Sequence, residues 1–220
     1  FFFYSHSPSD ESLKIALSQI EEKDVLFTFP TSKDQLELEK KFPKGYTEFL
    51  RQKFNCESLV MFFHGLNSNV ALISDHISLK EVSPKITKSY LEKKLHILKK
   101  NCPYQINKYL FLGINPHAGE NGLLGTEEEI IRLMGENPIP ADTAWQFMDS
   151  QTCLISAYHD QGLALFKSLE KFIGINITLG LPFLRLSVDH GTAFNLYSKN
   201  CADYTGCLYA LKEAMSYEIH

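Results

Sequence analysis

The sequence has few of the features that mark specialised classes of protein. Its five cysteines are an odd number in 220 residues, and no two of them are spaced Cys-x-x-Cys. This excludes a zinc ribbon of paired cysteines, argues against a disulfide framework and predicts a reduced, cytoplasmic chain. The sequence also lacks any run of about 18 apolar residues, so we expect no membrane span.

Strong charge of either sign is missing as well. The chain has 22 Lys and Arg against 26 Asp and Glu, which gives a formal net charge of -4. Without a basic field we expect no nucleic-acid partner. Neither the Gly-x-Gly-x-x-Gly motif of a Rossmann dinucleotide site nor the His-Glu-x-x-His motif of a zinc protease occurs. Any nucleotide or metal site is therefore built from residues that lie far apart in the sequence.

The sequence does contain a regular alternation of apolar strands and amphipathic helices. Hydrophobic residues make up 44% of the chain, which is enough to build a core. Strands are predicted at 25–29, 59–63, 70–74, 109–114, 153–157, 175–179 and 184–188, and helices at 10–22, 47–54, 83–100, 126–135 and 202–217. This order predicts an α/β fold with a largely parallel sheet.

Three histidines share one placement, directly after a predicted strand. They are His76, His117 and His159. Ligands bind at the carboxyl ends of strands in α/β sheets, so these three side chains can converge on one point. Imidazole binds Zn, Fe, Ni and Cu, and three protein ligands leave open positions for a substrate. One such histidine alone is more often a hydrogen-bonded structural residue, but the shared placement favours a metal site.

Two cations and an amide follow His159 at similar intervals. They are Lys167, Asn176 and Arg185. Arginine binds phosphate and carboxylate groups bidentately and lysine binds them as a point charge, so this set suits an anionic substrate. The alternative is a pair of solvated surface cations. Arg185 argues against that alternative, because a guanidinium in an apolar strand is unfavourable unless it is paired or faces a cleft.

Several longer stretches carry a resemblance to one enzyme family. They are Asn115-Pro116-His117-Ala118-Gly119-Glu120, Pro140-Ala141-Asp142-Thr143, Tyr158-His159-Asp160-Gln161-Gly162, the run from Asn176 to Phe183, and Ser187-Val188-Asp189-His190-Gly191-Thr192-Ala193. This ordered set closely resembles the 4-hydroxythreonine-4-phosphate dehydrogenases of vitamin B6 biosynthesis. The resemblance runs from about Val25 to the end of the chain.

The resemblance implies a fold like that of isocitrate and isopropylmalate dehydrogenases. Residues 1–220 would form a single two-lobed catalytic unit, and a homodimer would place each active site at its interface. His76, His117 and His159 match the family's metal ligands, and the position of His159 matches the ligand supplied by the partner subunit. Tyr46, Thr47, Lys167, Asn176 and Arg185 match substrate-binding positions, Asp189, His190 and Gly191 match the cofactor loop, and Lys167 and Asp142 are candidates for the general base.

The reaction that the resemblance implies is oxidation of 4-phosphooxy-L-threonine by NAD or NADP, followed by decarboxylation to 3-amino-2-oxopropyl phosphate. It uses one divalent ion per subunit, which is zinc, magnesium or cobalt. Two alternatives stay open. One is a dehydrogenase of the same fold that acts on four-carbon sugar-acid 4-phosphates such as threonate or erythronate 4-phosphate. The other is a non-catalytic relative that binds metal or NAD.

The chain departs from the family pattern in three places. Tyr46 stands where the family usually has histidine. A tyrosine can donate one hydrogen bond but cannot become an imidazolium, so this substrate contact is in doubt. The stretch between Thr126 and Asn137 is shorter than in the family, and the family's glycine-rich N-terminal strand and turn are missing. We therefore expect the gene to encode residues before Phe1.

Overall fold

The structure is a computed structural model that describes residues 9–31 and 45–217. Its strands are β1 (Val25–Thr28), β2 (Val60–His64), β3 (Asn69–Leu72), β4 (Lys108–Phe111), β5 (Thr152–Ser156), β6 (Ile175–Leu179) and β7 (Leu184–Val188). Its α-helices are α1 (Ser9–Gln19), α2 (Tyr46–Lys53), α3 (Val82–Lys85), α4 (Lys88–Asn101), α5 (Glu127–Arg132), α6 (His159–Glu170) and α7 (Thr205–Ser216). Short 3-10 turns are η2 (Leu79–Glu81), η3 (Pro116–Gly122), η4 (Ala141–Phe147) and η5 (Phe194–Leu196).

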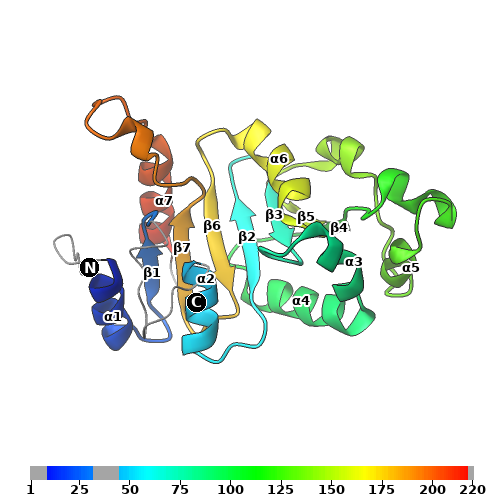
Figure 1. Ribbon diagram of the computed structural model, residues 1–220, viewed down its shortest axis with the longest axis horizontal. Helices are drawn as coiled ribbons and strands as arrows, with labels where there is room; N and C mark the ends of the chain where they lie inside the picture. Colours follow the sequence, from blue (N-terminus) through cyan, green and yellow to red (C-terminus); the bar gives the residue numbers. More distant parts are fainter. Residues whose placement is uncertain (1–8, 32–44, 218–220) are drawn as a thin grey trace.

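The strands form one continuous sheet in the order β1-β7-β6-β2-β3-β5-β4 (Figure 1). The neighbours β1–β7, β3–β5 and β5–β4 are parallel, whereas β7–β6, β6–β2 and β2–β3 are antiparallel. The α/β class is thus confirmed, but the prediction of a largely parallel sheet was wrong. The links at 65–68 and 180–183 are too short for the helical crossover that parallel neighbours need.

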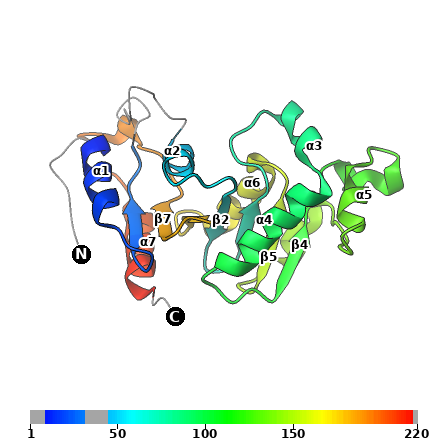
Figure 2. The same ribbon diagram turned by 90° about the horizontal axis from the view of Figure 1, so that it is seen from below.

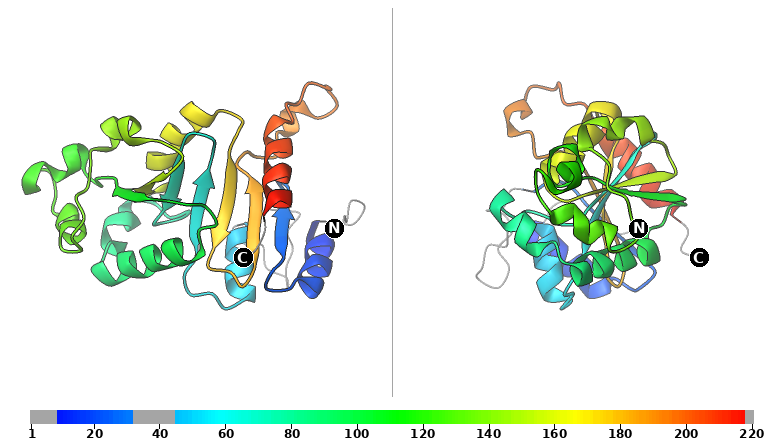
Figure 3. Two further views of the ribbon diagram at one scale, coloured as in Figure 1. Left: turned by 180° about the vertical axis from the view of Figure 1, so that it is seen from behind. Right: turned by 90° about the vertical axis from the view of Figure 1, so that its right-hand side faces the viewer.

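Strands β6 and β7 separate an apolar face from a polar one, because successive side chains of a strand point to opposite sides. In β6 and β7 the apolar residues Ile175, Ile177, Leu179, Leu184, Leu186 and Val188 belong to the core that α4 and α7 cover. Figures 2 and 3 show these two helices on one face of the sheet, with α2 and α6 on the other. The intervening polar residues therefore face α2 and α6.

The boundaries of β6 and β7 match the prediction residue for residue, but the helix predicted at 83–100 is divided. The structure has the short helix α3 and then α4, which begins after Thr87. Thr87 caps α4 by accepting a hydrogen bond of 3.3 Å from the backbone N–H of Tyr90. Within the described ranges no helix combines the length and the apolar character needed to cross a membrane.

A buried carboxylate holds the turn between β2 and β3. Glu170, the last residue of α6, accepts hydrogen bonds from the backbone N–H groups of Leu66 and Asn67 and from the Ser68 hydroxyl, at 3.0, 2.9 and 2.6 Å. A Cβ on Gly65 would lie 2.3 Å from the Glu170 carboxyl carbon, so only glycine fits there. This contact fixes the C-terminal end of α6 against the sheet.

We expect Glu170→Gln to lower the free energy of unfolding by about 1.5–3 kcal/mol, the usual worth of a hydrogen bond to a charged group. The amide keeps one acceptor oxygen, but its NH2 group meets an N–H donor. Urea denaturation at neutral pH measures the effect. The exposed Glu129→Gln is the matched control and should stay within about 0.5 kcal/mol of the wild type. Equal losses in the two variants would contradict this account of the turn.

Candidate active site

A cavity of about 1260 Å³ opens between the helices α2 and α6 and the strands β2, β6 and β7. It is lined by all but two of the residues that the sequence predicted for the site. These are Tyr46, Thr47, His76, His159, Lys167, Asn176, Arg185, Asp189, His190 and Gly191. The two that do not line it are His117 and Asp142. The cavity thus brings together the predicted substrate and cofactor residues and two of the three predicted metal ligands.

The floor of the cavity is the polar face of β6 and β7. Asn176 lies opposite Ser187 in the register of these strands, and Arg185 lies opposite Thr178. Asn176, Arg185 and Ser187 line the cavity, together with Met61 and Phe63 from β2. Alternation along two short strands is therefore enough to place an amide, a guanidinium and a hydroxyl on one surface.

Arg185 is buried, and its hydrogen-bond partners are neutral hydroxyls. Its side chain donates to the Thr178 hydroxyl at 3.2 Å and to the Thr28 hydroxyl at 2.8 Å, and the residue is 4% exposed. Burial lowers the pKa of this guanidinium to about 10. Among the described residues no carboxylate forms an ion pair with it, and neither its Nε nor the buried Asn176 Oδ1 makes a hydrogen bond. An uncompensated cation at a cavity floor is suited to bind an anionic group.

Lys167 connects α6 to the loop after β7. Its Nζ donates to the Asp189 carbonyl at 2.6 Å and lies 3.5 Å from the Asp189 carboxylate. The next residue, His190, has its Nε2 atom 3.7 Å from the Cys207 sulfur of α7. Contacts from two helices thus hold the predicted cofactor loop at the rim of the cavity.

The two histidines in the cavity come from parallel neighbouring strands. His76 follows β3 and His159 follows β5, and their ring centroids are 5.4 Å apart. The Nδ1 atom of His159 lies 2.7 Å from the Asp160 carboxylate. A carboxylate in this position fixes the ring and its tautomer and leaves Nε2 to bind a metal ion. His76 and His159 can therefore supply two of the three imidazole ligands of the predicted divalent-metal site.

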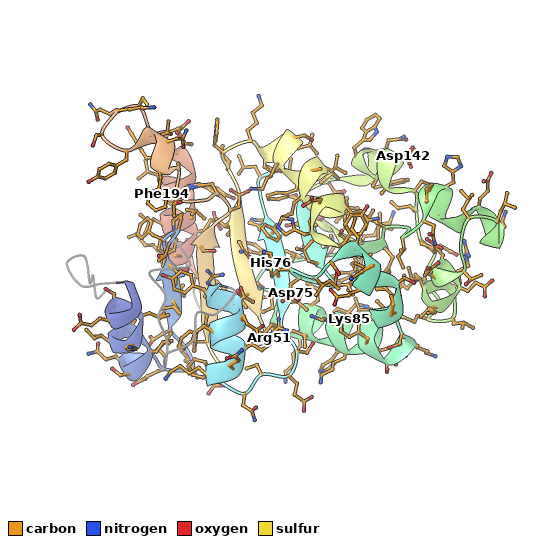
Figure 4. The ribbon with its side chains drawn as sticks, in the orientation of Figure 1. Arg51, Asp75, His76, Lys85, Asp142 and Phe194 are labelled. Carbon is orange, nitrogen blue, oxygen red and sulfur yellow. The ribbon has the colours of Figure 1, made fainter. Side chains whose placement is uncertain are left out.

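The third histidine lies elsewhere. His117 is in η3 beyond the edge strand β4, and its side chain is 68% exposed. Asp142 is in η4, which contacts η3, and Figure 4 shows it far from His76. In the part of the chain that the structure describes, no three His, Cys, Asp or Glu side chains form a metal-binding group. A single chain thus brings together two ligands of the predicted three, and the turn η3 places His117 outside the cavity.

The backbone around His117 is strained. Residues 117–121 all have positive φ, with 54° at His117 and 44° at Glu120. Left-handed residues other than glycine cost roughly 1–2 kcal/mol each. The buried Glu128 holds this turn by accepting hydrogen bonds from the N–H and the side-chain amide of Asn115, at 2.7 and 3.1 Å. Strain that the surrounding structure maintains is frequent at functional sites.

Comparison with known proteins identifies the family. The family described as pyridoxal phosphate biosynthetic protein PdxA matches residues 9–214. The chain belongs to the PdxA family. The 4-hydroxythreonine-4-phosphate dehydrogenase of Neisseria meningitidis serogroup A is 39% identical over 79% of this chain and 58% of that protein. That of Colwellia psychrerythraea is 37% identical over 94% of this chain and 69% of its own length. The chain thus spans little more than half the length of the first of these PdxA relatives.

Solved structures agree with the predicted fold class. A 4-hydroxythreonine-4-phosphate dehydrogenase from Klebsiella pneumoniae has a TM-score of 0.72 and 29% identity, covering 94% of this chain and 67% of that one. An isocitrate dehydrogenase from Methylococcus capsulatus has a TM-score of 0.50 and 12% identity, covering 94% and 70%. The likeness to the second concerns the fold alone. The isocitrate dehydrogenase-like fold expected from the sequence is therefore confirmed for this PdxA chain.

The sequence did not reveal a group of charged residues beside His76. Arg51 of α2 forms an ion pair with Asp75, and both side chains line the cavity next to His76 (Figure 4). Burial alone would raise the pKa of the Asp75 carboxyl, but Arg51 and the ammonium of Lys94 outweigh it and hold that pKa below its usual range. Lys94 is 3% exposed and donates to the Leu59 carbonyl. Cations on helices are usually solvated, so neither Arg51 nor Lys94 could be recognised as buried from the sequence.

Because Lys94 is buried, we expect the free energy of unfolding to depend on pH. Burial lowers the pKa of its ammonium from 10.5 to about 8, although the Asp75 carboxylate acts in the opposite direction. Between these values the unfolded chain binds more protons than the folded one, so the free energy of unfolding rises with pH in that window. Below pH 8 the buried charge has its full destabilising effect.

We therefore expect the wild type to gain stability relative to Lys94→Met between about pH 8 and pH 10, by on the order of 1–3 kcal/mol. Urea denaturation of both proteins at several pH values measures this difference, in which the other titrating groups cancel. Lys100→Met, a change of an exposed lysine on the same helix, should show no such window. A difference that stays constant with pH would refute the shift.

Proposed function

We propose that this chain carries the active-site cavity of a 4-hydroxythreonine-4-phosphate dehydrogenase. The substrate is 4-phosphooxy-L-threonine, and the product after oxidation and decarboxylation is 3-amino-2-oxopropyl phosphate. The observation that carries the proposal is the buried guanidinium of Arg185, which no carboxylate of the described residues pairs with, on a cavity floor that also holds Asn176. The names of the relatives support it.

The residues of the floor and wall bind the anionic substrate. Arg185 forks onto the phosphate, since a guanidinium matches phosphate geometry bidentately. The amide of Asn176 and the hydroxyl of Thr47 add hydrogen bonds, and the amino group of Lys167 lines the cavity from α6. A cavity of about 1260 Å³ exceeds what a four-carbon substrate fills, so it leaves space for a nicotinamide nucleotide beside Asp189, His190 and Gly191.

The predicted metal site fits the cavity if two subunits build it. His76 and His159 lie together in one chain, so the proposed third ligand is His117 of the partner subunit. The resemblance had implied that His159 is the partner's ligand, and the short distance between His76 and His159 leads us to reassign that role. Leu123, Leu133 and Trp145, near His117, are 77%, 72% and 58% exposed. Exposed apolar side chains of this size support a subunit interface here.

In the proposed oxidation, the metal ion and the cofactor would have different roles from the residues of the chain. His76, His159 and His117 of the partner subunit would hold a divalent ion, which would supply Lewis-acid polarisation, and the loop of Asp189, His190 and Gly191 would hold NAD or NADP as the hydride acceptor. Lys167 lines the cavity of its own chain and Asp142 does not, so we assign removal of the C3 hydroxyl proton to Lys167. Asp160 holds the ring of His159 through Nδ1. Closure of the site by a second subunit excludes water from the reacting groups.

Replacement of Arg185 separates a substrate ligand from a structural cation. We expect Arg185→Lys to weaken binding of 4-phosphooxy-L-threonine roughly ten- to hundredfold, because lysine keeps the charge but loses the bidentate geometry. Isothermal titration calorimetry measures the Kd, and thermal unfolding is followed on the same sample. Arg132→Lys is the matched control, since Arg132 donates to the Ala118 carbonyl outside the cavity. Unchanged affinity with lowered stability would show a structural role for Arg185.

Mixed dimers test the shared metal site. If His76 and His159 act in one chain with His117 of the partner subunit, mixing His117→Ala with His159→Ala subunits restores one complete site per heterodimer. Mixing His76→Ala with His159→Ala subunits restores none. We expect Co²⁺ binding and dehydrogenase activity to return only in the first mixture, to about half of the wild-type level per heterodimer. Recovery in the second mixture would show that His159 is the partner's ligand after all.

A further inference from the structure

Tyr46 stands at the position where the family usually has histidine, and its side chain contacts Arg185 and Thr31 of the same chain. The guanidinium carbon of Arg185 lies 5.6 Å from the centroid of its ring. Its hydroxyl lies 2.8 Å from the Thr31 hydroxyl. We propose that Tyr46 is a positioning residue, whose ring holds Arg185 in the orientation that binds the substrate phosphate. This inference rests on the proposed function and deepens it.

The first argument is electrostatic. The partners of the Arg185 guanidinium are the neutral hydroxyls of Thr28 and Thr178, and no carboxylate pairs with it in the described part of the chain. The face of an aromatic ring attracts a cation, and the attraction grows when both are removed from water. Tyr46 thus provides stabilisation that leaves the positive charge of Arg185 available to an anion. A carboxylate at the same place would instead compete with the phosphate.

The second argument is geometric. A guanidinium has five N–H donors in one plane. Thr28 and Thr178 take one donor each from the two terminal nitrogens, and Nε makes no hydrogen bond within the described residues. The ring of Tyr46 adds a contact at 5.6 Å that limits rotation of this plane. The remaining donors are therefore held for an anion in the cavity.

The third argument concerns how Tyr46 is itself held. Tyr46 is the first residue of α2, and Thr31, its hydroxyl partner, follows β1, which also carries Thr28. The hydroxyl of Tyr46 is therefore engaged with the protein at the same strand end that supplies an acceptor to Arg185. A neutral phenol also differs from an imidazolium, which would repel the adjacent guanidinium. Tyrosine thus serves the positioning role without adding charge.

The test compares variants by their Kd for inorganic phosphate and for 4-phosphooxy-L-threonine, measured by calorimetry on the full chain. We expect Tyr46→Leu to raise both Kd values about tenfold, which corresponds to about 1.4 kcal/mol, because the ring is lost. Tyr46→Phe keeps the ring and should stay within about threefold of the wild type. Tyr46→Met is a second variant without a ring, in case Tyr46→Leu does not fold. Tyr109→Leu, which removes a ring from Lys99 outside the cavity, is the matched control.

A double-mutant cycle adds a readout that a purely structural role would not change. If Tyr46 acts through Arg185, Tyr46→Leu has no further effect on either Kd in an Arg185→Leu background. Additive effects would overturn the proposal, as would a Tyr46→Phe variant that binds as weakly as Tyr46→Leu, since the hydroxyl would then contact the substrate itself. Failure of the wild type to bind either compound would remove the proposed function as well. Wild-type binding with no change in Tyr46→Leu would remove this inference alone.

Discussion

The arrangement of the cavity depends on one constraint, the burial of a positive charge on the face of a β-sheet. Arg185 is in the middle of β7, where alternation directs it away from the apolar core and toward α2. A buried guanidinium needs acceptors, and β1 and β6 supply them as the hydroxyls of Thr28 and Thr178. Both are neutral, and no carboxylate in the described ranges pairs with the guanidinium, so its charge is suited to bind an anion. The polar floor, the aromatic ring of Tyr46 and the cavity all adjoin that one position.

Helix α6 connects this floor to the histidine pair. It begins at His159, beside His76, and ends at Glu170, which is fixed by three hydrogen bonds to the turn after β2. Between these ends Lys167 reaches the carbonyl of Asp189 in the loop after β7. The proposed metal ligand His159, the proposed base Lys167 and the cofactor loop are therefore held by one helix.

The sequence predicted most of this site, and its errors have physical causes. Periodicity located β6 and β7, and the motif resemblance found the cavity residues from Tyr46 to Gly191. The rule that ligands gather at the carboxyl ends of strands specifies an edge of the sheet but not which strands are neighbours, so it grouped His117 with the other two histidines. Strand direction was misjudged because short apolar strands carry no signal for it. Arg51 and Lys94 were missed because their burial depends on how helices pack.

The separation of His117 from the other histidines is better explained by an incomplete site than by a misplaced ligand. The backbone of residues 117–121 is left-handed, and most of these residues are of types that disfavour this conformation. The buried carboxylate of Glu128 maintains the turn. A surface loop without a function would relax to ordinary backbone geometry, because no selected contact would maintain the strain. This turn instead presents His117 outward, beside exposed leucines and Trp145. A residue held in strain on an apolar surface is placed for another subunit, and the cavity of that subunit is the one in which a histidine pair lacks a third ligand.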